Sequence, residues 1–190
     1  MSESIDDYTK RYLKENLESL SGDYISKGLK ALIPVMKKLR EGGGTVFLFG
    51  NGGSASTASH LVNDISKGTI DDKRRRFRCL ALVDSVSTVM AWANDSSYAD
   101  VFSEQLKNLG SPGDIAIGIS GSGNSPNVLK ALEEARRMKM TTVGLIGMGG
   151  GKMKSLCDIS IVVPSNNMQH IEDAHMLVGH LIFAYLRDEA

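Results

Sequence analysis

The stretch TVFLFGNGGSASTASH at residues 45–60 decides the fold. Its apolar first half, Thr45 to Phe49, predicts a buried strand, and the small residues from Gly50 onward lead into a helix that carries His60. Glycines at a strand-to-helix junction let backbone N–H groups approach an anion, which the positive end of the helix also attracts. The stretch therefore predicts an α/β protein with an anionic ligand.

A dinucleotide is the first candidate for that ligand, because residues 50–55 satisfy the pattern G-x-G-x-x-A. That reading also needs an acidic residue about 20 positions further on to hold the ribose. Asp71 and Asp72 lie in a charged loop before the next strand, and Asp84 at the end of that strand comes 34 residues after Gly50. The acidic residue is misplaced, which argues against a dinucleotide.

Helical and strand patterns alternate along the whole chain, which predicts a parallel sheet with helices on both faces. We expect one domain over residues 1–190, with two helices in residues 1–44 that serve oligomerisation and an α/β core in 45–190. The apolar stripe of the second helix could equally cover the sheet. The expected strands are 45–50, 79–83, 114–120, 141–146 and 159–163, and the expected helices after the first strand are 54–66, 86–94, 98–109, 126–138 and 169–187.

The balance of charged residues in the composition argues against nucleic acid and membrane lipid as partners. Lysine plus arginine and aspartate plus glutamate both number 22, so no overall charge attracts nucleic acid or anionic lipid. The basic segment DDKRRRFR at 71–78 is then a solvated loop. The longest apolar runs fall short of the ~20 residues of a membrane span, and the polar N-terminus is unlike a signal peptide, so we expect a cytoplasmic protein. Cys79 and Cys157 are too few for a disulfide framework.

A second loop, GISGSGNSPNVLKAL from Gly118, carries three serines between glycines at another strand-to-helix junction. Ser125 is placed as the N-cap of a helix that begins at Pro126, so capping alone could explain it. Together with Ser120 and Ser122, however, it gives the turn three hydroxyl groups close together, which can donate hydrogen bonds to a phosphate monoester. The loop therefore favours a bound phosphate.

Histidines and carboxylates recur on two of the expected helices. His60 and Asp64 are four residues apart and share a helix face, which suits a site or an ordinary surface hydrogen bond. On the last helix, spacing alone would pair Glu172 with His175, or Asp173 with His180.

Taken together, these motifs resemble the sugar isomerase (SIS) family, and within it the phosphoheptose isomerases. The resemblance rests on GNGGSA with His60, ANDSSYADVFSEQL from Ala93, the serine loop, GGGKM from Gly149, and the last helix with His180. It implies a doubly wound, flavodoxin-like five-stranded sheet and a homotetramer with active sites at subunit interfaces. It also implies interconversion of sedoheptulose 7-phosphate and a manno-heptose 7-phosphate through an enediolate.

The resemblance also assigns residues. The expected substrate-binding residues are Asn51, Gly52, Gly53, Ser54, Asn94, Asp95, Ser120, Gly121, Ser122, Ser125 and Glu172. The expected ligands of a divalent metal, zinc first, are His60, Asp64, Glu172 and His180. Asp64 is the expected base and His180 its acid–base partner, with Glu172 as the other candidate base.

Four positions depart from the family pattern. Asp64 replaces a glutamate, Glu172 a glutamine, Gly121 a threonine and Gln169 an acidic residue. Isomerisation of a different ketose phosphate therefore stays open, as does a non-catalytic SIS module that binds a phosphosugar or a protein.

Overall fold

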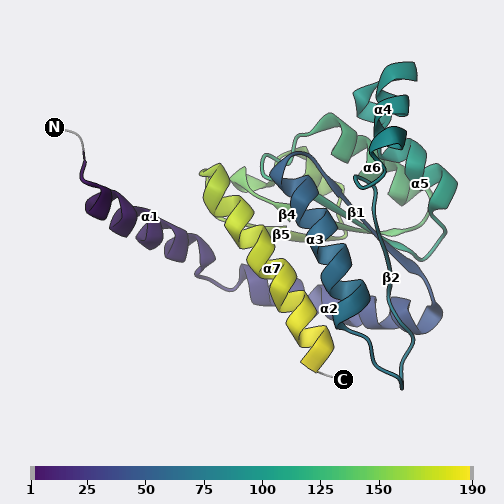
Figure 1. The fold of residues 1–190 in the computed structure, drawn as a ribbon, viewed down its shortest axis with the longest axis horizontal. Coiled ribbons are helices and arrows are strands. Elements are labelled where there is room, and N and C mark those ends of the chain that lie inside the picture. The colour runs from purple at the N-terminus through teal and green to yellow at the C-terminus, as the bar shows by residue number, and fades with distance from the viewer. Residues whose placement is uncertain (1–2, 189–190) are drawn as a thin grey trace.

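The computed structural model describes residues 3–188, which form a parallel five-stranded sheet in the order β2-β1-β3-β4-β5 (Figure 1). The strands are β1 (Thr45–Gly50), β2 (Arg78–Ala81), β3 (Ile115–Ser120), β4 (Thr141–Ile146) and β5 (Ile159–Val162). The longer helices are α1 (Ile5–Leu20), α2 (Tyr24–Gly42), α3 (Gly53–Gly68), α4 (Val86–Asp95), α5 (Ser103–Leu109), α6 (Pro126–Arg137) and α7 (Met168–Asp188). Short 3-10 turns are η1 (Tyr98–Asp100), η2 (Met148–Gly150) and η3 (Lys152–Ser155). The predicted doubly wound, flavodoxin-like sheet is confirmed.

Two hydrophobic layers sandwich the sheet because successive side chains of a strand point to opposite faces. In β1, Val46 and Leu48 pack with α2, α3 and α7, whereas Phe47 and Phe49 pack with α5 and α6. Helices cover both faces, which explains why every residue of β1 is buried.

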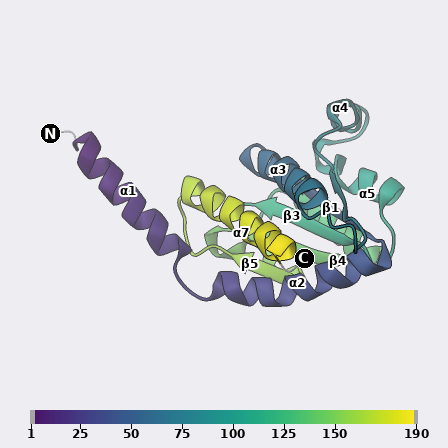
Figure 2. The same cartoon turned by 60° about the horizontal axis from the view of Figure 1, so that its bottom comes forward.

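Helix α1 extends away from the body of the protein (Figures 1 and 2). It contacts α7 through Asn16 Nδ2, which donates to Asp173 Oδ2 at 2.8 Å, and through the Tyr12 ring, which meets the His170 ring edge-on. Leu20 at its end packs against the small apolar cluster that includes Ile171 and Ala174 of α7. Its side chains Ile5, Leu13 and Leu17 are more than half exposed. In this chain α1 covers little of the core.

One predicted helix was wrong. The expected helix over 98–109 is divided into η1 and α5, with Val101 and Phe102 between them. Asp100 lies at the break, where its carboxylate accepts a hydrogen bond from Ser96 and pairs with Lys130, while its carbonyl accepts one from Ser103 Oγ at 3.2 Å. These side-chain contacts override the local helical pattern.

Within residues 3–188, none of the helices combines the length and apolarity that a membrane crossing needs.

Candidate active site

A small cavity lies at the carboxyl ends of β1 and β3. Its volume is about 270 Å³. These two strands are neighbours in the sheet, but the chain continues from β1 to β2 on one side and from β3 to β4 on the other. Doubly wound proteins bind ligands at the point where the strand order reverses in this way. The cavity is lined by Asn51, Gly52, Gly53, Ser54, Ile119, Ser120, Gly121, Ser122, Ser125, Met168 and Glu172.

The first loop of the cavity begins α3. Gly52 adopts a φ of 56°, and the next residue, Gly53, lies directly against Glu172 of α7. A Cβ atom on Gly53 would lie 2.5 Å from Glu172 Oε1. The absence of a side chain at this position therefore allows a carboxylate to reach the helix N-terminus and the cavity.

The serine loop joins β3 to α6. The expected N-cap position of Ser125 is confirmed, yet its side chain makes no capping hydrogen bond, and its Oγ lies 3.1 Å from Ser120 Oγ. Gly123 N donates to Ser120 Oγ at 3.2 Å. Gly123 has a φ of 64° and lies against Gly150, so the glycine-rich turn after β4 packs directly against the serine loop.

A residue that the sequence analysis missed holds the two loops together. Asn127, buried in the first turn of α6, exchanges two side-chain hydrogen bonds with Asn51, at 2.9 and 2.8 Å. Tyr98 also donates to Asn51 Oδ1 at 2.9 Å. An asparagine just after a helix-initiating proline gives no sequence signal beyond the helix itself, and its partner lies 76 residues away.

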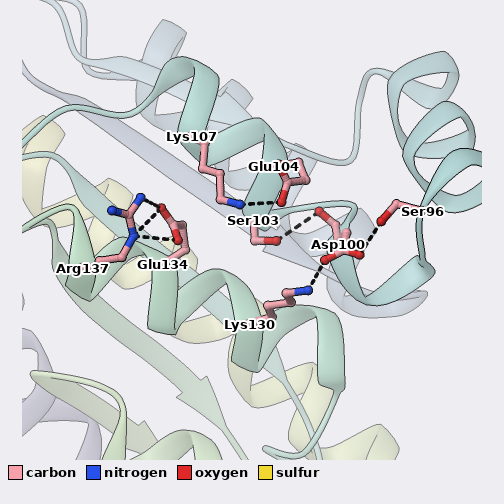
Figure 3. Close-up of polar contacts among 8 residues, drawn as sticks. All are labelled: Ser96, Asp100, Ser103, Glu104, Lys107, Lys130, Glu134 and Arg137. Atoms are coloured by element: carbon pink, nitrogen blue, oxygen red, sulfur yellow. Dashed lines mark hydrogen bonds and ion pairs between the residues drawn. The ribbon is translucent and has the colours of Figure 1, made fainter.

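An ionic network joins η1, the segment that contains Tyr98, to α6 (Figure 3). Asp100 accepts a hydrogen bond from Ser96 at 2.7 Å and pairs with Lys130 of α6. Hydrogen bonds from Lys130 and Ser96 keep the pKa of the Asp100 carboxyl below its usual value. The segment after α4 is therefore fixed against the helix that begins at the serine loop.

The second expected substrate segment does not line this cavity. Asn94 and Asp95 lie exposed at the end of α4, where Asn94 Nδ2 donates to Asp95 Oδ1 at 2.8 Å. Tyr98, from the segment that follows, makes the contact with the first loop instead.

Three of the expected metal ligands do come together. His60 Nε2 lies 3.0 Å from His180 Nε2, and Asp64 Oδ2 lies 3.2 Å from the first nitrogen and 3.9 Å from the second. Two imidazole nitrogens and a carboxylate oxygen facing one another form a suitable donor set for zinc, with a position left for a further ligand. Both histidine side chains are about half exposed.

Glu172 does not join this group within one chain. Helices α3 and α7 lie side by side and run parallel, with Gly53 against Glu172, Leu61 against Gly179 and Gly68 against Phe183 (Figure 1). Eight residues separate Glu172 from His180, which is about 12 Å along a helix at 1.5 Å per residue. The four expected ligands therefore divide into a group of three and a carboxylate in the serine-loop cavity.

The remaining histidines of α7 belong to the interior. His170 and His175 are at most 2% exposed, and burial lowers the pKa of His175 to about 4. The two cysteines are free, and burial raises the pKa of Cys79 and Cys157 to about 12. These thiols are therefore protonated at neutral pH.

Comparison with known proteins identifies the family. A model of the SIS domain matches residues 10–147. The chain belongs to the SIS family. It is 40% identical over 177 residues to a phosphoheptose isomerase of Paramagnetospirillum magneticum, a match that covers 92% of each chain. It is also 40% identical over 170 residues to one of Helicobacter pylori, covering 89% of this chain and 87% of the relative.

Solved structures of SIS proteins agree with the fold. The structure of a phosphoheptose isomerase from Francisella tularensis matches with a TM-score of 0.89 at 26% identity, covering 98% of this chain and 100% of that one. The enzyme from Neisseria gonorrhoeae matches with a TM-score of 0.88, at the same identity and coverage. The family resemblance expected from the sequence motifs is therefore confirmed.

Proposed function

We propose that this protein is an aldose–ketose isomerase that interconverts sedoheptulose 7-phosphate and D-glycero-D-manno-heptose 7-phosphate. The observation that carries the proposal is the cavity at β1 and β3, which combines serine hydroxyl groups, a helix N-terminus and the Glu172 carboxylate. The phosphoheptose isomerases that resemble the chain over most of its length support this choice of substrate.

The serine loop supplies the phosphate end of the site. Ser120, Ser122 and Ser125 present hydroxyl groups to the cavity, and α3 and α6 both begin beside it. Hydroxyl donors and helix N-termini stabilise the charge of a phosphate monoester. The sugar phosphate is thereby held by its unreactive end.

Isomerisation needs a base that moves a proton between carbon 1 and carbon 2, and an acid that protonates the sugar oxygens. Two carboxylates are available: Glu172 lines the cavity, while Asp64 lies beside His180. Asp64 with His180 forms an acid–base pair, and Glu172 is the base that the cavity of a single chain offers. Donors around the sugar oxygens stabilise the enediolate.

A divalent metal, zinc first, suits the group formed by His60, Asp64 and His180. Held by His60, Asp64 and His180, such a metal would supply Lewis-acid polarisation of the sugar's carbonyl oxygen. Neutral imidazole rings are required for such binding, so it weakens at low pH.

Formation of an oligomer would bring the group of His60, Asp64 and His180 together with a serine-loop cavity. We infer a homotetramer in which residues 1–44 take part in subunit contacts, because α1 exposes Leu13 and Leu17 and covers little of its own core. In such an assembly the half-exposed histidine group of one subunit would face the cavity of another, and Glu172 of that cavity would complete the metal set. We place the reaction in the cytoplasm, since charged sugar phosphates do not cross membranes unaided.

The direct experiment incubates purified protein with sedoheptulose 7-phosphate and follows aldose formation by NMR. A Ser120→Ala/Ser122→Ala variant serves as the inactive control. Turnover of another ketose phosphate in preference would assign a different sugar, and phosphosugar binding without turnover would assign a non-catalytic SIS module.

A second experiment tests the shared site. The Ser120→Ala/Ser122→Ala variant and a His180→Asn variant, each inactive alone, are co-expressed with different tags and the hybrids purified. If each site combines two subunits, about a quarter of the sites in a random mixture are intact and activity returns. Hybrids as inactive as their parents would contradict shared sites.

A further inference from the structure

A basic cavity lies at the end of the sheet opposite to the candidate active site. It has a volume of about 280 Å³. Arg40 and Glu41 contribute from the last turn of α2, which precedes β1, and Lys73, Arg74 and Arg75 contribute from the loop that precedes β2. Because β1 and β2 are parallel, both segments meet at the amino ends of the strands.

Arg40 is the central residue of this cavity. Its side chain packs over the Phe77 ring, with 5.0 Å between the guanidinium carbon and the ring centre, and the residue is only 6% exposed. Its Nη1 atom is buried and has no hydrogen-bond partner among residues 3–188. A buried donor of a charged group without a partner is costly, so its presence points to a missing acceptor.

The charges around Arg40 are incompletely balanced. Arg74 pairs through Nε with Asp71 at 2.7 Å, and Glu41 adds a second carboxylate. Burial and the nearby charge of Arg74 together lower the pKa of the Arg40 guanidinium. Among residues 3–188, the carboxylates of Glu41 and Asp71 lie with the four cationic side chains that line the cavity, and this described set has an excess of two positive charges.

The carboxyl end of α2 stabilises the charge of Arg40, which lies in its last turn, and of two further arginines, but it provides no acceptor for Arg40 Nη1. Arg75 Nη1 lies against Gly43 at the end of α2, and Arg78 Nη1 donates to the Gly43 carbonyl at 3.4 Å. Cations are stabilised there by the negative end of the helix dipole. The unpartnered Arg40 Nη1 needs an acceptor of another origin.

We propose that this cavity is a second ligand site, which binds the phosphate group of a small phosphorylated metabolite. A phosphate monoester carries close to two negative charges at neutral pH and three acceptor oxygens. Its charge matches the excess in the cavity, and its oxygens supply the acceptor that Arg40 lacks, in the geometry that a guanidinium group favours. The volume admits a phosphate and a small organic group but not a large cofactor.

Inorganic phosphate at pH 8 is the probe, used at constant ionic strength in the Ser120→Ala/Ser122→Ala background so that the serine loop contributes little. Binding is followed by calorimetry and by the thermal unfolding midpoint. We expect saturable binding that Arg40→Gln abolishes, and that Arg75→Gln weakens about tenfold, the loss of one charge-assisted contact. Arg76→Gln is the matched control, because Arg76 is exposed in the same loop and does not line the cavity.

The proposal would be overturned by the absence of saturable binding in this background, or by equal binding by the parent and both cavity variants. Equal weakening by Arg75→Gln and Arg76→Gln would also overturn it, because a diffuse charge effect would then suffice. If Arg40→Gln lacks a cooperative unfolding transition, Arg40→Lys takes its place. Lysine keeps the charge but not the paired donors, and we expect weaker, measurable binding.

Discussion

The hydroxyl group of Ser125, at the start of α6, lies 3.1 Å from the hydroxyl group of Ser120, at the end of β3. A serine in the N-cap position usually accepts a hydrogen bond from the first turn of its helix, and this one does not. Pro126 has no N–H group and Val128 N donates to Asn127 Oδ1 at 3.0 Å, so the first turn of α6 leaves the Asn127 N–H beside the two hydroxyl groups. An anion placed there accepts hydrogen bonds from these three groups.

Replacing Ser120 and Ser122 together by alanine should weaken phosphosugar binding at least 100-fold, since each hydrogen bond to a charged group contributes about 1.5–3 kcal/mol. Thermal unfolding should stay close to that of the parent. Calorimetric titration measures the affinity, with Ser155→Ala, an exposed serine outside the cavity, as the control. Unchanged affinity in the double variant would disprove the phosphate assignment.

Chelation should destabilise the protein if His60, Asp64 and His180 hold a metal. At a metal concentration 100 times the dissociation constant, binding stabilises by about 2.7 kcal/mol, so EDTA should lower the unfolding midpoint by roughly 5–10 °C. Elemental analysis should find metal in the parent and none in His60→Asn. Reduced occupancy in Glu172→Gln would show that Glu172 is a ligand in the assembly, and equal occupancy would exclude it.

Gly179 should control how closely α3 and α7 approach. A Cβ atom at this position would lie 2.1 Å from Leu61 Cδ2, so Gly179→Ala should push the helices apart and cost about 1–3 kcal/mol of stability. Metal affinity should fall as well, because His60 and His180 lie on the same two helices. Adding Leu61→Ala should restore part of the metal affinity. Unaltered metal binding in Gly179→Ala would contradict this coupling.

His175 should make stability depend on pH in the acidic range. Burial lowers its pKa to about 4, against an ordinary value of 6.5, so the unfolded chain binds a proton that the folded chain does not. Stability is therefore unaffected above about pH 6.5 and falls by up to about 3 kcal/mol as the pH drops to 4. Urea unfolding across this range measures the effect, and His175→Leu should flatten the profile relative to the parent.

The sequence predicted what local patterns encode. The strands 45–50 and 141–146 begin and end where periodicity places them, and the spacing of His60 and Asp64 brings their side chains into contact. Glu172 shows what residue spacing along a helix does not predict. Spacing pairs it with His175, yet His175 is buried in the core and Glu172 reaches Gly53 of α3. The parallel packing of α3 and α7 that decides this is a tertiary contact between segments more than 100 residues apart.

Tertiary contacts also explain why the sequence analysis missed Asn127 and wrongly predicted one continuous helix over 98–109. The exchange of hydrogen bonds between Asn127 and Asn51, and the pairing of Asp100 with Lys130, join residues that are distant in sequence. Side-chain contacts of this kind leave no periodic pattern. They also fix the geometry of the candidate site more directly than any helix propensity does.

Gly121 constrains how this site can evolve. A Cβ atom there would lie 2.4 Å from Met168 Sδ, so the methionine occupies the space that a larger residue at 121 would need. The Sδ atom lies near the end of a flexible, exposed side chain, so a side chain at position 121, such as the threonine of the family pattern, requires Met168 either to adopt another rotamer or to be replaced by a shorter residue. The two positions should therefore change together among descendants of this chain.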